Sequence, residues 1–143
     1  MISLPLGGYA APWKGRFTLQ WINKGQFPSF ATICGLNNNL YIVSDNHLLW
    51  KNPSENNSIW KKAGNANNIK LLAGLNNKLF AVTNKRNLLE ANAIEEKVTW
   101  EKTGFVNNSV IALTGSESKL YAANKNGSIW MADISKNSIN WSR

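Results

Sequence analysis

Short runs of apolar residues, separated by turns rich in Asn, Gly and Ser, make up most of this 143-residue chain. The runs carry Val, Ile, Leu, Tyr, Phe and Trp, the residue types that are enriched in β-strands. Links such as Asn37-Asn38 and Asn76-Asn77 tolerate the left-handed backbone that tight hairpin turns require. No segment keeps a sustained helical period. The pattern therefore predicts an all-β fold.

Tryptophans recur at a nearly constant spacing. Trp21, Trp60, Trp100 and Trp141 are 39, 40 and 41 residues apart, and each of the first three is followed four residues later by a glycine. A mid-repeat glycine, a leucine-aromatic pair and a second apolar pair keep the same register. These positions are Gly35, Gly74 and Gly115; Leu40-Tyr41, Leu79-Phe80 and Leu120-Tyr121; and Leu49-Trp50, Leu88-Leu89 and Ile129-Trp130. Several positions in one register across three units indicate a repeat protein.

Each repeat is predicted to form four short strands. In the first repeat these are residues 30–36, 39–44, 48–51 and 58–62. The second repeat has them at 69–75, 78–83, 87–91 and 98–102, and the third at 109–114, 119–124, 128–131 and 139–142. We expect an extended N-terminal arm at 1–15 and an extra strand at 16–23. The repeat domain then covers 16–143, with units at about 26–64, 65–104 and 105–143.

Four antiparallel strands in about 40 residues is the organisation of a β-propeller blade. The pattern Trp-x-x-x-Gly, an apolar strand, Leu-Tyr-x-Val/Ala and a final Leu/Ile-Trp resembles the repeats of tectonin and tachylectin-type propellers. The resemblance covers residues 17–141 and lacks the Gly-His and Trp-Asp signatures of WD repeats. Leu89 departs from it, because the other two repeats have Trp at this position. The resemblance implies a non-enzymatic, sugar-binding propeller.

Three blades are too few for a closed ring, since propellers typically close with 4–8 blades. An open arc leaves apolar flanks and sheet edges uncovered. We expect two chains to form a homodimer that closes a six-bladed ring with twofold symmetry, with strand 16–23 reaching across to the partner. The alternatives are a fragment or a larger hetero-complex, in which a different protein completes the ring, and a stable open monomer.

The chain is basic, with 16 Lys and Arg against 8 Asp and Glu and a formal charge of +8. No run of Lys and Arg exceeds two residues, so a solvated basic surface is favoured over binding to nucleic acid. The single cysteine, Cys34, excludes an intramolecular disulfide and is expected to be a buried, inert thiol. The N-terminus resembles no signal peptide and no stretch is long enough to span a membrane, so a cytoplasmic location is favoured.

Catalytic and metal-binding patterns are missing from the sequence. The only histidine, His47, falls in a predicted turn, and no His/Cys cluster has metal-ligand spacing. There is no nucleophile motif and no phosphate-binding loop, and the acidic residues do not recur at matching positions of the repeats. We therefore expect no enzymatic activity, metal or cofactor.

Two aromatic positions could face a ligand. The recurrent tryptophans at 21, 60, 100 and 141 are expected to pack between sheets. Trp50 and Trp130 share another register and precede polar turns, and aromatic rings beside amides and amines are suited to sugars. The candidate site residues are Trp50, Asn52, Asn92 and Trp130, with Lys51 or Lys125 for acidic sugars.

The sequence supports two functions almost equally. A glycan-binding module has a slight lead because of the resemblance. A protein-interaction or assembly subunit is the alternative, and nucleic-acid binding through the basic surface is a weaker third hypothesis.

Overall fold

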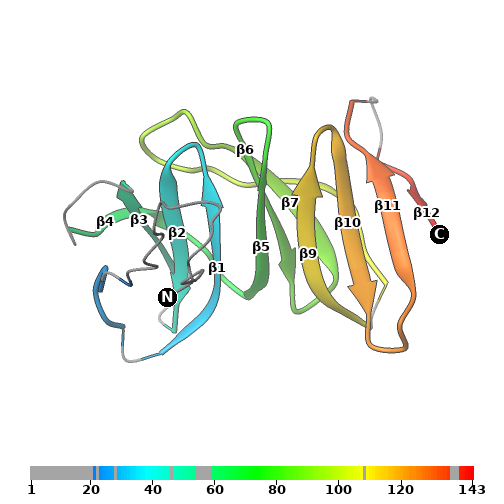
Figure 1. Ribbon diagram of the computed structural model, residues 1–143, viewed down its shortest axis with the longest axis horizontal. Helices are drawn as coiled ribbons and strands as arrows, with labels where there is room; N and C mark the ends of the chain where they lie inside the picture. Colours follow the sequence, from blue (N-terminus) through cyan, green and yellow to red (C-terminus); the bar gives the residue numbers. More distant parts are fainter. Residues whose placement is uncertain are drawn as a thin grey trace, which may run out of the picture.

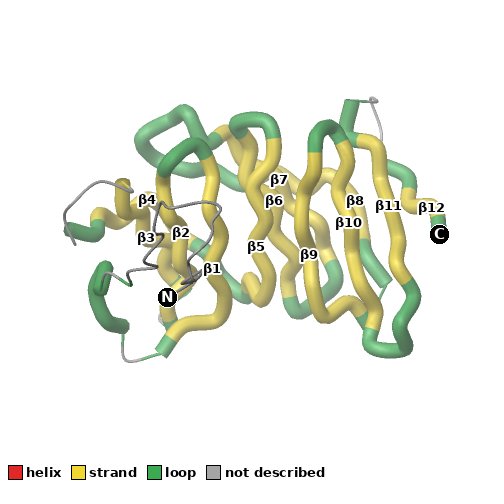
Figure 2. The backbone as a smooth tube through the Cα atoms, in the orientation of Figure 1, coloured by secondary structure: helices red, strands yellow, loops and turns green. Residues whose placement is uncertain are grey.

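The computed structural model describes residues 21, 23–27, 29–45, 47–53, 59–107, 109–135 and 139–143. These residues form three four-stranded antiparallel sheets without any helix (Figure 1; Figure 2). The all-β prediction is therefore confirmed. A search of the same residues for a helix long and apolar enough to cross a membrane finds none. The predicted arm at 1–15, and residues 16–20 and 22 of the predicted extra strand, lie outside the described residues.

Each sheet consists of four strands that are consecutive in the sequence, and we call the three sheets blades 1, 2 and 3. Blade 1 contains β1 (Phe30–Leu36), β2 (Asn39–Ser44), β3 (Leu48–Pro53) and β4 (Lys61–Asn65). Blade 2 contains β5 (Ile69–Leu75), β6 (Lys78–Thr83), β7 (Asn87–Asn92) and β8 (Glu101–Phe105). Blade 3 contains β9 (Val110–Ser116), β10 (Lys119–Asn124), β11 (Ile129–Asp133) and β12 (Trp141–Ser142).

The first three strands of every repeat agree with the prediction to within two residues at each end. The fourth strand does not. It begins at Lys61 rather than 58 in blade 1 and at Glu101 rather than 98 in blade 2, and β12 is shorter than predicted. The prediction placed Trp60 and Trp100 inside these strands, whereas both residues precede them. Their side chains make contacts outside their own sheet, which the strand pattern could not show.

The recurrent tryptophans join each blade to the segment before it. The indole nitrogen of Trp100 donates a hydrogen bond of 2.7 Å to the carbonyl oxygen of Asn65, the last residue of β4. The Trp141 indole does the same to Phe105, the last residue of β8, at 2.8 Å. Trp60 donates to Lys24, before blade 1, at 2.7 Å. The Trp spacing therefore records a repeated contact between neighbouring repeats.

Trp21 corrects the expectation that all four recurrent tryptophans pack between sheets. Its side chain is 90% exposed, whereas those of Trp60, Trp100 and Trp141 are half-buried. Each of the other three tryptophans donates a hydrogen bond to a backbone carbonyl oxygen of an earlier segment of the chain. No described residue precedes Trp21, so the described chain offers it no equivalent partner.

The hairpin turns after β1 and β5 use the predicted Asn pairs in left-handed conformation. Asn37 and Asn38 have φ angles of 52° and 62°, and Asn76 and Asn77 have 52° and 64°. Asn is one of the few residues that adopt this region readily. The Asn37 amide also donates a hydrogen bond to the Asn77 side chain, which links the two turns across neighbouring blades.

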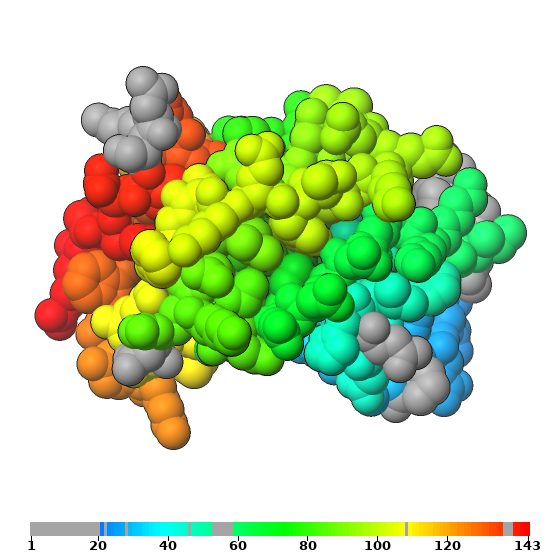
Figure 3. Space-filling model, turned by 180° about the vertical axis from the view of Figure 1, so that it is seen from behind, coloured from blue at the N-terminus to red at the C-terminus, as the bar shows by residue number. Residues whose placement is uncertain are grey.

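The inner strands β1, β5 and β9 lie side by side, with β5 in the middle. Blades 1 and 3 extend from them in opposite directions and blade 2 recedes behind them (Figure 1). Seen from behind, blade 2 lies in the centre, between blade 3 in orange and red and blade 1 in cyan (Figure 3). The three sheets therefore radiate from their inner strands, as the blades of a propeller do.

Two apolar clusters fill the spaces between neighbouring blades. The cluster between blades 1 and 2 includes Tyr41, Val43 and Leu49 together with Leu72, Leu79 and Ala81. The cluster between blades 2 and 3 includes Phe80, Val82 and Leu88 together with Val110, Leu120 and Ala122. Blade 2 therefore presents one apolar face to blade 1 and the other to blade 3, which is how repeat proteins build a continuous core.

Candidate functional site

The outermost faces of blades 1 and 3 leave uncovered several positions whose equivalents in blade 2 are buried. We call these faces the first flank, which carries Phe30 and Ile33, and the last flank, which carries Tyr121, Ala123 and Ile129. Ile33 is 49% exposed, whereas Leu72, at the equivalent position of blade 2, is 4% exposed. Ile129 is 56% exposed, whereas its counterpart Leu88 is fully buried. Each flank therefore exposes side chains whose equivalents in blade 2 are buried against a neighbouring blade.

The last flank also contains a hollow. A cavity of about 240 Å³ lies over β9, β10 and β11 and is lined by Ala112, Leu113, Thr114, Tyr121, Ala122, Ala123 and Ile129. On the first flank, Ile42 and Asn52 are buried, so the open part of this face lies near β1. Single exposed apolar residues are normal on protein surfaces, but residues gathered on one sheet face indicate a site of contact.

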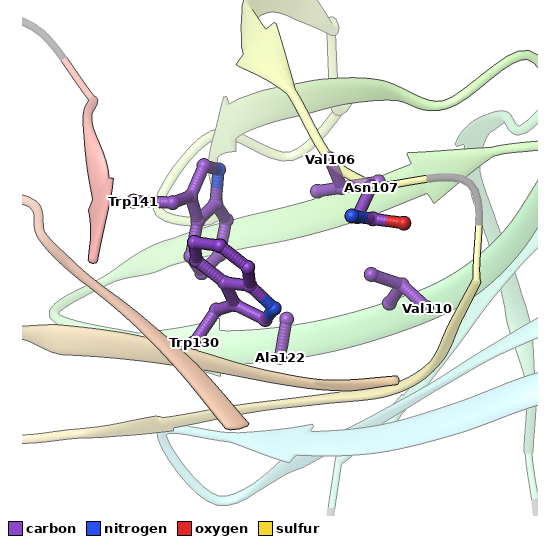
Figure 4. A pocket seen from close by; sticks show the side chains of 6 residues that line it. All are labelled: Val106, Asn107, Val110, Ala122, Trp130 and Trp141. Carbon is purple, nitrogen blue, oxygen red and sulfur yellow. The ribbon is translucent and has the colours of Figure 1, made fainter. Parts of the chain in front are cut away.

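A second feature lies between blades 2 and 3, where a cavity of about 210 Å³ is lined by two tryptophans (Figure 4). Trp130 and Trp141 form one side, and Val106, Asn107 and Val110 lie across from them, with Ala122 below. Trp130 comes from β11 and Trp141 from β12. We call this space the two-tryptophan cavity. The guanidinium carbon of Arg143 lies 5.9 Å from the centre of the Trp130 ring, within the range of a cation–π contact.

The six candidate residues from the sequence are spread over the molecule. Trp50 is half-buried, and its indole nitrogen donates to the Ser44 hydroxyl at 3.3 Å. Asn52 is fully buried, and its amide donates to the Ile59 carbonyl at 2.7 Å. Lys51 lines a different hollow, of about 350 Å³, together with Lys61 and Lys62.

The remaining candidates lie elsewhere. The exposed Asn92 side chain accepts a hydrogen bond of 2.9 Å from the Ile94 backbone amide, so it stabilises a turn. Lys125 is exposed in the turn between β10 and β11. Of the six candidates, Trp130 alone lines the two-tryptophan cavity. Sequence reasoning assigned its second ring, Trp141, to core packing and did not single out Asn107. The sequence did carry a signal for this pair, because Trp130 and Trp141 both occupy recurring positions of the repeat.

Two titratable groups sit at the interface between blades 1 and 2. Burial raises the pKa of the Cys34 thiol to about 12. Burial, and secondly the nearby Cys34, raise the pKa of the Tyr41 hydroxyl. A thiolate is the nucleophilic form of cysteine, so Cys34 is an unreactive thiol at neutral pH. The raised pKa agrees with the predicted inert thiol, whereas Cys34 is half-buried rather than buried as expected.

The described residues offer no conventional metal site. A search of them for groups of three or more His, Cys, Asp or Glu side chains close enough to hold an ion finds none. His47 lies exposed in the turn between β2 and β3, as predicted.

No protein-family model matches this chain, and no curated protein sequence matches it. Among solved structures, the N-terminal domain of Nup159 matches with a TM-score of 0.56 at 13% identity, over 91% of this chain and 34% of that one. A chain in an S. cerevisiae complex of Dbp5 bound to Nup159 and Gle1 matches with a TM-score of 0.58 at 13% identity, over 89% and 32%. The chain therefore spans about a third of the length of each of these two solved chains. At this identity the likeness concerns the fold alone, and it shows that the three sheets form part of a β-propeller.

Proposed function

We propose that this chain is a non-enzymatic protein-interaction module that assembles through the flanks of its outer blades. The main observation in its support is that positions on the outer faces are exposed whereas the equivalent positions of blade 2 are buried. Phe30 and Ile33 on the first flank are about half exposed, whereas Ile69 and Leu72 are 4% exposed. An exposed face whose equivalent is a packed interface is suited to bind the same kind of surface.

The partner that best fits the two flanks is a second copy of this chain. The first flank has the side chains that face a preceding blade, and the last flank has those that face a following blade. The two flanks of one chain therefore complement those of a second chain in a head-to-tail manner. Three blades that occupy half a ring reach six when doubled, within the 4–8 blades of closed propellers.

Measurement of the mass in solution tests this proposal. We expect the full chain to sediment as a dimer, at twice its 15.9 kDa, and to dissociate on dilution. Ile33→Glu and Ile129→Glu each place a charge on one flank and should shift the protein to monomer, because an unpaired charge in an apolar interface is costly. Ile94→Glu is the matched control, since Ile94 is 71% exposed in the turn after β7.

A mixture of the two flank variants gives a sharper test. In a head-to-tail dimer, a mixed pair keeps one interface free of substitutions, so mixing Ile33→Glu with Ile129→Glu should restore part of the association. If like flanks pair instead, one of the two single variants will remain dimeric. A wild-type chain that stays monomeric at high concentration would overturn the homodimer. If it then copurifies with a larger protein from its native source, the hetero-complex is supported instead.

Glycan binding is the second candidate, and it follows from the tectonin and tachylectin-type resemblance, which stays a prediction from the sequence. The observation in its favour is the pair of half-buried rings, Trp50 and Trp130, at equivalent positions of two blades. Such rings can stack on the apolar faces of sugars. A glycan array probed with the folded wild-type chain and with Trp130→Leu tests it. Absence of any binding by the folded wild-type chain removes this candidate.

A further inference from the structure

The two-tryptophan cavity has two counterparts in the same chain, and they differ in what fills them. In blade 1, the equivalents of Trp130, Trp141 and Val106 are Trp50, Trp60 and Phe27. The Phe27 ring lies 5.1 Å from the Trp60 ring, edge to face, and 6.1 Å from the Trp50 ring, between ring centres. The first of the three sites is therefore filled by an aromatic ring from the chain itself.

The second site is filled by aliphatic side chains. In blade 2 the equivalent residues are Leu89, Trp100 and Ala66; Ala66 belongs to the apolar cluster between blades 1 and 2, and Leu89 and Trp100 pack against that cluster. In blade 3 neither solution is used, because Val106 is too short to replace a phenyl ring and Trp130 lies outside the corresponding cluster. The outcome is a cavity of about 210 Å³. An apolar cavity of about 150 Å³ accepts benzene, so a single aromatic ring fits.

Two buried polar atoms, one on a residue that lines this cavity and one on a residue two positions along β10 from another lining residue, have no hydrogen-bond partner within the described part of the chain. They are the indole nitrogen of Trp130, a donor, and the side-chain oxygen of Asn124, an acceptor. Asn124 is 5% exposed and lies two residues beyond Ala122 on the same buried face of β10. Trp130 pairs with Ala122 across β10 and β11, and its nitrogen points towards Ala122 in Figure 4. In blade 1 the equivalent atoms bond directly, from Trp50 to Ser44 at 3.3 Å.

We propose that the two-tryptophan cavity binds a hydroxylated aromatic ring, for which a simple phenol is the minimal ligand. The ring takes the place that Phe27 occupies in blade 1. The hydroxyl accepts a hydrogen bond from the Trp130 indole and donates one to the Asn124 amide oxygen, so one group satisfies both atoms. The Asn107 side chain lies across the cavity from the two indoles. This site lies between blades 2 and 3 and is independent of the flanks and of the proposed assembly.

NMR of the tryptophan indole N–H signals of the full chain tests the proposal, with each signal assigned by a Trp→Phe variant. p-Cresol should shift the signals of Trp130 and Trp141 and leave that of Trp60 unchanged. It should bind about tenfold more tightly than toluene, which has the ring without the hydroxyl, because a satisfied buried polar pair contributes about one factor of ten. Equal binding of toluene and p-cresol, or no shift with either ligand, would overturn the assignment of the two polar atoms.

Three variants locate the site and its chemistry. Val106→Phe supplies the ring that blade 1 already has and should abolish binding. Trp130→Leu reproduces blade 2 and should do the same, which covers the case in which Val106→Phe fails to fold. Asn124→Leu should keep ring binding and reduce the preference for p-cresol over toluene to near parity. Continued binding of p-cresol by folded Val106→Phe would place the ligand elsewhere and overturn the proposal.

Two further ligands identify the source of the ring. N-acetyltyrosinamide carries the phenol on a peptide backbone, so its binding would indicate a tyrosine side chain of a protein ligand. Binding of p-cresol alone would indicate a small free phenol. N-acetylglucosamine is the contrasting probe, and if it shifts the Trp130 signal where phenols do not, the site is a sugar site and the proposal is wrong.

Discussion

Gly74 lies so close to the carbonyl oxygen of Gly35 that a Cβ atom on Gly74 would be 2.7 Å from it, and equally close to the Leu36 Cβ atom. This contact brings β1 and β5 together at the inner edge of blades 1 and 2. The mid-repeat glycine of the sequence is therefore needed because the backbone of the neighbouring blade approaches it closely.

Gly74→Ala should destabilise the chain by about 1–3 kcal/mol, as overpacking in a well-packed region does. Chemical denaturation monitored by tryptophan fluorescence measures the change. Gly35→Ala is the matched control, because the nearest atom to its added Cβ, the Asn39 carbonyl oxygen, is 3.8 Å away. Both should be compared in the Ile33→Glu background, where flank docking is removed. Equal losses in the two variants would show that the close approach does not explain the repeated glycine.

The tryptophan just before or at the start of each blade's fourth strand should stabilise the fold through its indole N–H group as well as through its ring. Trp100→Phe keeps an aromatic ring but removes the 2.7 Å hydrogen bond to Asn65, so a loss of about 1 kcal/mol or more in unfolding free energy is expected. Trp21→Phe should change stability by less than about 0.5 kcal/mol, because Trp21 is 90% exposed. If both variants lose the same stability, the hydrogen bond is not what holds neighbouring repeats together.

Stability should fall at alkaline pH, partly because of Cys34. The folded chain has a Cys34 pKa of about 12, raised by burial, against an ordinary value of 9.0. Between these values the unfolded chain has lost the thiol proton that the folded chain keeps, so rising pH favours unfolding across this window and has no such effect below it. Tyr41, whose pKa is also raised, acts in the same direction.

Cys34→Ala isolates this contribution. The midpoint of urea denaturation should fall less steeply from pH 9 to pH 11 in Cys34→Ala than in the wild-type chain, and the two slopes should be equal from pH 6 to pH 8. Tyr41→Phe measures the second group separately. Parallel curves for wild type and Cys34→Ala over the alkaline range would mean that the thiol ionises equally well in the folded chain.

The sequence predicted the strands best where the side chains obey the sheet pattern. β1, β2, β5, β6 and β10 have the predicted bounds because their apolar residues follow the strand pattern, and Asn pairs in left-handed conformation mark the turns of the first two hairpins. The fourth strands were misplaced because Trp60 and Trp100 resemble strand residues, while their indoles bond to the preceding repeat. A pattern within one repeat cannot show a contact that reaches into another.

The candidate site could be predicted only in part, for a different reason. Trp130 was selected from its register, but the cavity depends on the absence of a large side chain at Val106, which is visible only beside Phe27 and its two tryptophans. The two unpartnered atoms, on Trp130 and Asn124, depend on a pairing that blade 1 makes and blade 3 does not. Such differences between the repeats can be recognised only once the packing of the side chains is known.

Phe27→Ala should convert the filled site of blade 1 into a cavity and thereby test the comparison between the copies. Because Phe27 is half-buried, the expected cost is about 1–3 kcal/mol, below the 3–5 kcal/mol of a fully buried phenylalanine. The new cavity should accept an aromatic ring between Trp50 and Trp60. Here the Trp50 indole already donates to Ser44, so p-cresol and toluene should bind at this position with equal affinity. NMR shifts of the Trp50 and Trp60 indole signals measure both affinities. A strong preference for p-cresol at this site would show that the hydroxyl is recognised without the unpartnered atoms, and that the polar pair in blade 3 is not the basis of selectivity.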